Sequence, residues 1–280
     1  MVESAKMTGI FFQFSELTHA LICLPLDYVS GKMMLVRSMV FDMQTIFTKP
    51  SEPLEYPEEL TPNFAAMTPY QYEKCLNANA EKLLKIKTIL LGGGPISSNL
   101  QDRIIESGQN VFLSYGMTET YSHIALKKIT RSSPSFKTLN GITCSTNKDK
   151  TLVIHAPMLG IKKLKTNDLV HLIDEQNFDF IGRIDNVINS GGIKLHPEEI
   201  ERKLAALHWT VPFFTIGLPD EKLGQKLVLC IESENALNLS SIAEVLSKFE
   251  QPKEVFYFKK FNYTGSGKIN RSLTIKNYYS

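Results

Sequence analysis

The sequence predicts an α/β protein in which a partial large domain precedes a small α+β domain. Short apolar runs alternate with amphipathic segments up to about residue 122, which is the pattern of a layered α/β fold. A β-rich stretch with polar turns then continues to about residue 183, and a compact mixed unit follows it. The length of 280 residues is enough for about two domains, in agreement with this division.

The composition excludes several classes of protein. With 43% apolar residues, 21% charged residues and a net charge of +2, the chain is globular rather than disordered. The near balance of charge disfavours a nucleic-acid partner, and no apolar run is long enough to span a membrane. The N-terminus carries no targeting pattern, so we expect a cytoplasmic protein with no membrane partner. The four cysteines form no metal-ligand or disulfide pattern, and we expect them to be buried.

The clearest local unit of the large domain is a strand, a glycine loop, a helix and a second strand. Ser97 or Ser98 can cap the helix and Gly108 can end it. A crossover of this kind makes the two strands parallel. We expect strands at residues 20–24, 86–91 and 111–114, and the helix at residues 97–107.

The remaining elements come from the β-rich stretch and the last unit. The β-rich stretch is expected to form a small sheet or barrel, with strands at residues 151–155, 169–173 and 178–181. In the last unit, Pro197 fits the first position of a helix whose apolar spacing continues to Leu207. The rest of that unit is predicted to contain strands at 211–218 and 226–232, a second helix around 242–249 and a final strand at 255–258.

Two loops that follow neighbouring strands are candidates for ligand binding, because open parallel sheets bind ligands beyond the carboxyl ends of their strands. The glycines of residues 92–94 let a ligand approach the backbone closely. In residues 115–120, Thr118 supplies a hydroxyl and Glu119 a carboxylate that can hold Mg²⁺. The alternative is that both loops are ordinary turns.

Two segments nearer the C-terminus also contain glycines. Residues 264–269 surround Lys268 with small residues, but they lack the first glycine and the Ser or Thr of a Walker A phosphate loop. A single lysine on such a loop is by default a solvated charge. Residues 182–192 lie where a hinge between the domains would be, and a plain linker explains their glycines nearly as well.

Six segments in this order resemble those of the adenylate-forming ligases, the superfamily of acyl-CoA synthetases, luciferases and peptide-synthetase adenylation domains. Together they cover most of the chain, and the most specific of them is YGMTET at residues 115–120. The others are LPLDYVSG at 24–31, LLGGGPIS at 90–97, TND at 166–168, GRIDNVINSGGIK at 182–194 with PEEIE at 197–201, and TGSGKINR at 264–271.

The resemblance implies a two-step reaction. A carboxylic acid would attack the α-phosphate of Mg²⁺-bound ATP to give an acyl-adenylate and pyrophosphate, and coenzyme A would then displace AMP. In this family the C-terminal domain is mobile and swings between the two steps. The implied domains are a truncated N-terminal AMP-binding domain at residues 1–183 and a C-terminal domain at residues 184–280.

The resemblance also implies roles for the residues that match the family's motifs. Lys268 would bridge the carboxylate and the α-phosphate as charge builds up in the transition state. Thr118 would contact phosphate, and Glu119 would hold Mg²⁺. These three residues are the expected catalytic group.

The nucleotide and coenzyme A would be bound by further matching positions. Tyr115 would stack on adenine, while Asp168 would accept hydrogen bonds from the ribose hydroxyls and Arg183 would add donors nearby. The other implied positions are Gly92, Gly93, Gly94 and Gly116 around the nucleotide, Gly191 and Gly192 along the pantetheine tunnel, and Asp185 at the hinge.

Within the family, residues 28–37 look like those of the ligases that act on o-succinylbenzoate, an acid with two carboxylates. The carboxylate that is not activated needs a cation or a donor in its pocket. We expect Lys32 or Arg37 to supply it, in a substrate pocket that includes Tyr28. The alternatives are that both cations lie on the outer face of a helix beginning near Gly31, and that the substrate is another aryl or fatty acid.

The chain departs from the family pattern at two places. Asn167 stands where the family usually has Gly, and Asn tolerates left-handed backbone angles. The Ser/Thr/Gly-rich phosphate loop is not found, and residues 1–14 resemble the helix that follows it, so we expect the large domain to lack its beginning.

Three explanations for the absent loop are open: an incomplete gene reading, a partner chain that supplies the loop, or a homologue that binds AMP or acyl-CoA without activating an acid. We expect the partners to be a small carboxylic acid, ATP and coenzyme A, and a homodimer is an open alternative to a monomer.

Overall fold

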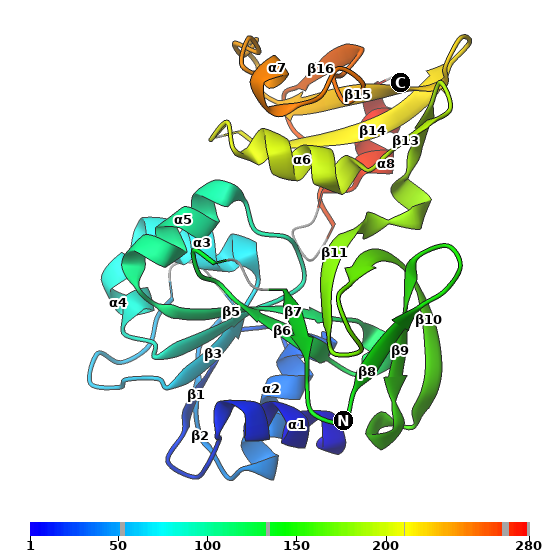
Figure 1. The fold of residues 1–280 in the computed structure, drawn as a ribbon. Coiled ribbons are helices and arrows are strands. Elements are labelled where there is room, and N and C mark those ends of the chain that lie inside the picture. Colours follow the sequence, from blue (N-terminus) through cyan, green and yellow to red (C-terminus); the bar gives the residue numbers. More distant parts are fainter. Residues whose placement is uncertain (51–53, 133–134, 210, 265–268, 279–280) are drawn as a thin grey trace.

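Two β-sheets follow one another along the chain in the computed structural model, which describes residues 1–50, 54–132, 135–209, 211–264 and 269–278. A sheet of eleven strands forms the first two thirds of the chain, and a sheet of five strands belongs to the C-terminal unit (Figure 1). The short 3-10 turn η3, Ile184–Asn186, lies between them. Across these described ranges, no helix combines the length and the apolar character needed to cross a bilayer.

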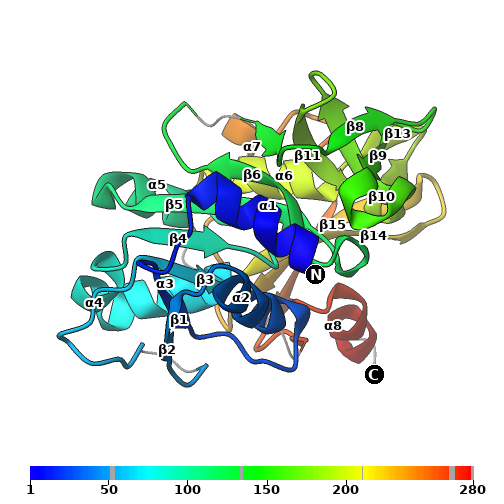
Figure 2. The ribbon, with the colours of Figure 1, turned by 90° about the horizontal axis from the view of Figure 1, so that it is seen from below.

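The first half of the large sheet is parallel and has helices on both faces. Ala20 and Ile22 pack with α1 and α2, whereas Leu21 packs with α3, α4 and α5, because successive side chains of a strand point to opposite faces. In Figure 1, α1 and α2 lie below the sheet, and in Figure 2 they lie in front of it. In sheet order the strands are β2 Gln44–Phe47, β1 His19–Ile22, β3 Phe64–Met67, β4 Thr88–Leu91 and β5 Asn110–Gly116. The helices are α1 Val2–Phe12, α2 Val29–Val40, α3 Pro69–Ala78, α4 Ala80–Leu84 and α5 Ser98–Ser107.

The predicted unit of strand, loop, helix and strand is confirmed as β4, α5 and β5. The two strands pair in parallel, with Leu91 opposite Leu113. The helix begins where Ser97 Oγ accepts a hydrogen bond from the Leu100 N–H (3.1 Å), and it ends at Gly108, whose φ is 69°. The prediction of buried cysteines is also confirmed, since all four are buried.

The β-rich stretch has strands at the three expected places, and these strands form the antiparallel part of the large sheet. The reason is that β6 turns back and pairs antiparallel with β5, with Tyr115 opposite Ala125. The order then continues through β7, β11, β10, β9 and β8. These strands are β6 His123–Lys128, β7 Phe136–Thr138, β8 Thr143–Thr146, β9 Thr151–Ala156, β10 Ile161–Leu172 and β11 Asn177–Arg183.

The C-terminal unit has the expected order of helix, two strands, helix and strand, with additions that sequence reasoning missed. The helix expected around residues 242–249 is only one turn, α7 Ile242–Val245, and Phe249 is exposed. The additions are the hairpin of β12 Ile188–Ser190 and β13 Ile193–Leu195, and the helix α8 Arg271–Tyr278. The expected elements are α6 Pro197–Ala205, β14 Phe213–Asp220, β15 Gly224–Glu232 and β16 Glu254–Phe258.

Candidate active site

The two predicted loops lie together at one edge of the large sheet. Because β4 and β5 are parallel neighbours, residues 92–94 and 117–120 leave the sheet on the same side. A Cβ atom on Gly92 would lie 2.7 Å from Ser114 Oγ of β5, which shows how closely the first loop packs on the second strand. The structure therefore brings together the two groups that the sequence singled out.

Two of the expected glycines are required by the backbone itself. Gly93 has a φ of 90°, which side chains other than glycine rarely adopt. A Cβ on Gly116 would lie 2.3 Å from the Ser122 carbonyl oxygen and 2.4 Å from the His123 Cα, both backbone atoms that cannot move aside easily. Gly94, in contrast, has open space where a Cβ would stand. Close packing against the backbone thus explains the glycine of the second loop.

Thr118 and Glu119 lie on the exposed turn that follows β5. The turn is the 3-10 helix η1, Thr118–Thr120, and buried Thr120 holds it by accepting from the Met117 N–H (3.1 Å). Thr118 and Glu119 are both exposed. No group of three or more His, Cys, Asp or Glu side chains that could hold a metal occurs among the described residues. Glu119 could therefore contribute one carboxylate to a Mg²⁺ ion whose other ligands come from a bound phosphate and water.

A connected polar group next to this turn consists of Tyr115, Asp168 and Arg183. The Tyr115 hydroxyl donates to Asp168 Oδ2 at 2.5 Å, and Arg183 Nη1 lies 3.7 Å from Asp168 Oδ1. The Tyr115 ring is buried and packs edge-on against Phe178, with 5.1 Å between ring centroids. Burial raises the pKa of Tyr115 above its ordinary value, and the nearby Asp168 charge raises it further. The structure thus gives Tyr115 a hydrogen-bonding role beside the expected ribose-binding carboxylate.

Asp185, the expected hinge residue, joins this group from the connection to the C-terminal unit. Arg183 Nη2 donates to Asp185 Oδ2 at 2.9 Å, and Asn167 Nδ2 donates to the same oxygen at 3.1 Å. The hydrogen bond between Arg183 and Asp185 raises the pKa of the guanidinium and lowers the pKa of the carboxyl. Asn167 stands where the resembled family usually has Gly, so its amide makes a contact here that glycine cannot make.

Arg37 lies inside the protein, on the face of α2 that meets Ser122, the residue before β6. It is 2% exposed, so the alternative that it lies on the outer face of its helix is wrong. Its Nη2 donates to Ser122 Oγ at 2.7 Å. Among the described residues, its Nη1 has only the Met34 sulfur at 3.6 Å and its Nε has no hydrogen-bond partner. Burial lowers the pKa of Arg37 to about 10, which leaves it charged at neutral pH. The guanidinium thus keeps donors available for a further acceptor.

A chain of hydrogen bonds runs from Arg37 to α1 through two residues that sequence reasoning missed. The Thr8 hydroxyl donates to the Ser4 carbonyl (3.0 Å), so it must accept from His123 Nε2–H (3.1 Å). His123 Nδ1 then accepts from the Ser122 hydroxyl (3.3 Å), which itself accepts from Arg37. Burial lowers the pKa of His123 well below its ordinary value, and Arg37 lowers it further, so the ring is neutral. The one signal in the sequence is that Ser122 and His123 directly follow the 115–120 segment.

The first comparison with known proteins concerns the family. Residues 2–145, just over half of the chain, match the family model described as AMP-binding enzyme. The chain belongs to this family. The family's matched region contains α1 to β8, and with them both strand-end loops and Arg37.

Individual members of the AMP-binding family are similar over nearly all of this chain. The 2-succinylbenzoate–CoA ligase of Listeria monocytogenes is 27% identical over 96% of this chain and 63% of its own length. The solved structure of an AMP-forming acyl-CoA synthetase/AMP-acid ligase II-like protein from Dyadobacter fermentans is 36% identical, with a TM-score of 0.63, over 99% of this chain and 83% of that one. The structure of the o-succinylbenzoate coenzyme A synthetase of Bacillus subtilis in complex with ATP and magnesium has a TM-score of 0.83 over 97% of this chain and 64% of that one. Its sequence is only 22% identical, so this likeness shows the fold alone. The chain therefore spans less than two thirds of the length of that Listeria ligase.

The remaining predicted positions of this AMP-binding family member are spread over its surface. Lys32 is exposed on the outer face of α2, as the alternative interpretation expected, and Tyr28 is 48% exposed at the start of that helix. Gly191 and Gly192 form the turn of the β12–β13 hairpin with φ values of 59° and 83°. Lys268 lies outside the described residues.

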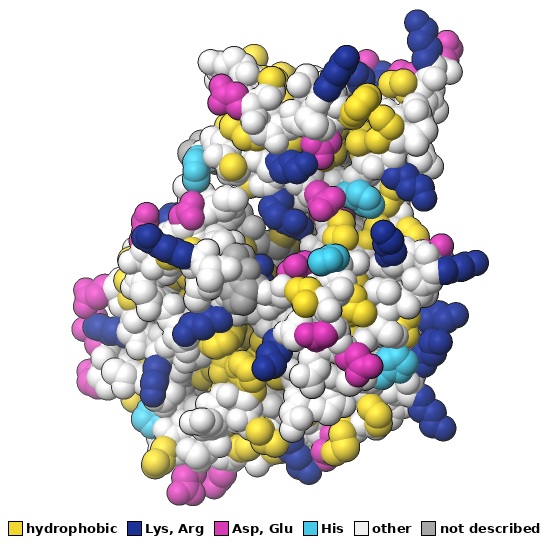
Figure 3. Space-filling view, in the orientation of Figure 1, with side chains coloured by type: hydrophobic (Ala, Val, Ile, Leu, Met, Phe, Trp, Pro, Cys, Tyr) yellow, Lys and Arg dark blue, Asp and Glu magenta, His cyan; other side chains and the backbone are white. Residues whose placement is uncertain are grey.

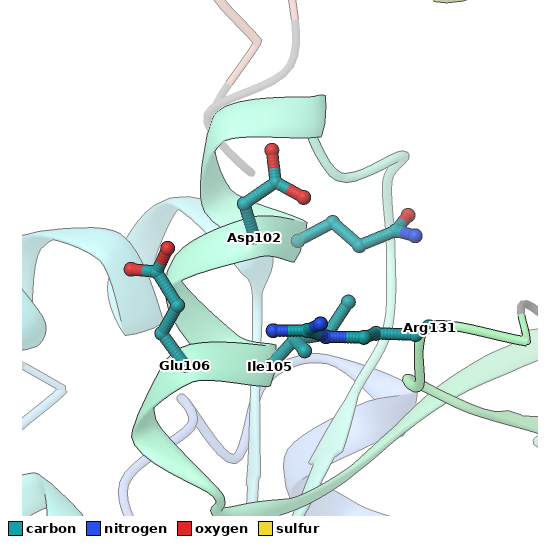
Figure 4. A pocket seen from close by; sticks show the side chains of 5 residues that line it. Asp102, Ile105, Glu106 and Arg131 are labelled. Carbon is teal, nitrogen blue, oxygen red and sulfur yellow. The ribbon is translucent and has the colours of Figure 1, made fainter.

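A shallow cleft of about 350 Å³ lies between α5 and the loop after β6 (Figure 4). Asp102 and Glu106 are one helical turn apart there, and Arg131 extends across toward α5. The side chains that line this cleft include none of the predicted site residues. We therefore place the candidate active site at the strand ends and not in this cleft.

Proposed function

We propose that this chain carries the main part of an ATP-dependent acid–CoA ligase that forms an acyl-adenylate and then an acyl-CoA thioester, and that its acid is o-succinylbenzoate. The observation that supports this most is the meeting of the two strand-end loops with the Tyr115–Asp168 pair at one edge of the sheet. The similarity to curated 2-succinylbenzoate–CoA ligases supports the choice of acid. We further propose an AMP-binding domain at residues 1–183, a C-terminal domain at 184–280, and a cytoplasmic location.

ATP would bind across the two loops. The glycine loop, in which Gly93 is exposed, offers room for phosphate, and the Thr118 hydroxyl would contact the phosphate from the neighbouring strand end. Asp168 retains acceptor capacity beside its Tyr115 bond and would accept from the ribose hydroxyls. Bound through Glu119, Mg²⁺ would neutralise phosphate charge and hold the phosphates in place. In this arrangement Tyr115 positions Asp168 through its hydroxyl, and adenine would contact the ring where it borders the site.

The C-terminal unit would bring the remaining groups. Lys268 would stabilise the charge that builds up between the acid and the α-phosphate. Gly191 and Gly192, at an exposed hairpin turn, would allow the pantetheine arm of coenzyme A to pass close to the backbone. Arg183, Asp185 and Asn167 would define the hinge by their mutual hydrogen bonds.

Arg37 is the residue that we assign to the second carboxylate of the acid. Its guanidinium is buried, charged and without a carboxylate among the described residues, and a carboxylate ligand would accept from the donors that it has free. The site is next to the second strand-end loop, because Ser122, which holds Arg37, packs against Gly116. Lys32 faces solvent, so we do not assign it to the second carboxylate.

The test is exchange of labelled pyrophosphate into ATP, measured with and without o-succinylbenzoate. We expect exchange that depends on the acid and that falls roughly 100-fold or more in Lys268→Ala. Lys260→Ala, an exposed lysine of the same C-terminal unit, is the matched control and should leave exchange unchanged.

Calorimetric titration with AMP distinguishes an active ligase from a homologue that only binds adenylate. Binding of AMP with no exchange would support the second candidate, a homologue that binds adenylate without activating an acid. A chain that neither binds AMP nor supports exchange would contradict both proposals.

A further inference from the structure

Charge is distributed unevenly along the chain, which the net value of +2 conceals. Residues 1–121 contain nine basic residues (Lys and Arg) and thirteen acidic residues (Asp and Glu). Residues 122–183 contain ten basic and five acidic residues. Residues 151–167 contain three lysines and no acid. This stretch forms β9 and most of β10, and Lys and Arg side chains gather along that edge of the molecule, at the right of Figure 3. The basic residues therefore share one region of the surface.

The three lysines of this stretch, Lys162, Lys163 and Lys165, are exposed in the first part of β10. None of them takes part in an ion pair with another described residue. Two acids of the same unit are engaged elsewhere: Asp168 accepts from Tyr115, and Asp174 accepts from Asn177 and the Gln176 N–H at the β10–β11 turn. The positive charge of these lysines is therefore not neutralised within the described fold.

The turn before the lysines presents an apolar side chain on a fixed backbone. It is the 3-10 helix η2, Pro157–Leu159, which is closed by the Gly160 N–H donating to the Pro157 carbonyl at 2.9 Å. Leu159 is buried in the core of the large sheet, whereas Met158 is 61% exposed. Packing of Leu159 thus holds the turn, and Met158 projects outward next to the basic strand.

We propose that this β9–β10 corner, residues 157–165, docks on the surface of a bilayer that contains anionic lipids. Lysines near such a surface are attracted to it, and an exposed apolar side chain among them can enter the boundary between headgroups and acyl chains. The corner contains no aromatic residue on which nucleic-acid bases could stack, which favours lipid over a single-stranded nucleic acid. The expectation of no membrane partner rested on the lack of a membrane-spanning apolar run and of a targeting pattern, and neither of these describes the surface of this corner.

The test is sedimentation of the chain with vesicles of phosphatidylcholine alone or with phosphatidylglycerol. We expect binding only to the acidic vesicles, and binding that weakens as salt is added. Changing Lys162, Lys163 and Lys165 together to Gln should lower the partition coefficient by roughly 100-fold, at about fivefold per lysine. Met158→Ser should lower it by roughly fivefold through the lost apolar contact.

The matched control changes Lys87, Lys248 and Lys253 to Gln, which removes the same charge from exposed positions in connecting segments elsewhere in the chain. This control should bind acidic vesicles like the wild type, and circular dichroism should show that all variants are folded. Equal losses in both triple variants, or no binding to acidic vesicles by the wild type, would overturn the proposal. The proposal would also be overturned if a DNA duplex displaced the chain from vesicles at a lower phosphate concentration than added lipid does.

Discussion

Two buried or partly buried arginines, one on a helix of each unit of the molecule, are held by different kinds of contact. Arg37, on α2, is 2% exposed, and its contacts are neutral: the Ser122 hydroxyl and a thioether sulfur. Arg271, at the start of α8, keeps 28% of its side chain exposed, yet it has the Glu201 carboxylate at 2.8 Å. It also donates to a backbone carbonyl and lies over the Phe214 ring. Arg37 is thus the more deeply buried of the two, yet among the described residues it is the one that has no carboxylate partner.

The difference fits a structural role for Arg271 and the ligand-binding role that we propose for Arg37. Burying a charge costs free energy unless an opposite charge and hydrogen bonds accompany it. Glu201 meets that requirement for Arg271, whose role is explained by the fold of the C-terminal unit. Among the described residues, no such group accompanies Arg37, and its Nε has no hydrogen-bond partner. An anion that enters the site would complete its surroundings, as Glu201 does for Arg271.

The largest expected effect comes from breaking the complete pair. At pH 8, where Glu201 is mostly ionised, Glu201→Ala should lower the free energy of unfolding by about 3 kcal/mol, because Arg271 loses its anion and the Thr215 N–H loses its acceptor. Denaturant unfolding monitored by circular dichroism measures this loss. Glu234→Ala is the control, since it removes a carboxylate paired with Lys259 at the surface, and it should cost less than about 1 kcal/mol. Similar losses in the two variants would mean that Glu201 has no special role.

The next effect concerns binding at the incomplete site. Arg37→Met should weaken the binding of o-succinylbenzoate roughly 10- to 100-fold, because a charged hydrogen bond is lost, while stability stays equal or rises. Calorimetric titration and thermal unfolding measure the two quantities. Benzoylpropionate, which lacks the ring carboxylate, should bind wild type and variant alike.

Lys32→Met is the matched control for this variant, since Lys32 lies on the same helix but faces solvent. It should leave the affinity for o-succinylbenzoate unchanged. An equal loss of affinity in both variants, or a large loss of stability in Arg37→Met, would contradict the distinction between the two arginines.

A smaller effect follows from the titration of Glu201. Burial raises the pKa of Glu201 to about 7, although Arg271 and the Thr215 N–H act in the opposite direction and Glu198 in the same one. The Cys230 thiol is the other titratable group coupled to it. A carboxyl whose folded pKa is raised contributes stability that is present below its unfolded pKa and is lost as pH rises through the folded value. The wild type should therefore lose up to about 1.4 kcal/mol per pH unit between pH 5 and 7, relative to Glu201→Gln. Parallel stability profiles of the two proteins over that range would rule this out.

Local signals explain which parts of the fold were predictable from the sequence. Helix α5 was predicted within a residue because Ser97 and Gly108 mark its ends directly. The strand-end loops were predicted to meet because the ends of parallel neighbours always share an edge. Helix α8 was missed because Thr274 and Ile275 are its only buried residues, which gives no apolar stripe to read.

Long-range contacts explain what could not be predicted. Ser122, which receives the Arg37 donor, is 85 residues away along the chain, and Glu201 and Arg271 are 70 residues apart. A single sequence gives no register between such segments, so it left open whether Arg37 or Lys32 faced inward. The continuation of the large sheet through β6 was missed for the same reason, since it depends on a strand pairing and not on the composition of either strand.

The smallest expected effect probes the hydroxyl that takes the place of an anion beside Arg37. Ser122→Ala removes the acceptor at 2.7 Å and leaves one more guanidinium donor without a partner, so it should cost about 1 kcal/mol of stability. The ring of His123 would lose its Ser122 contact but keep Thr8, so α1 should stay in place. Because Arg37 keeps its charge, the affinity for o-succinylbenzoate should fall only a few-fold, less than in Arg37→Met. Thermal unfolding and calorimetry check both values, and a loss of affinity as large as that of Arg37→Met would show that Ser122, and not the guanidinium charge, dominates anion binding at this site.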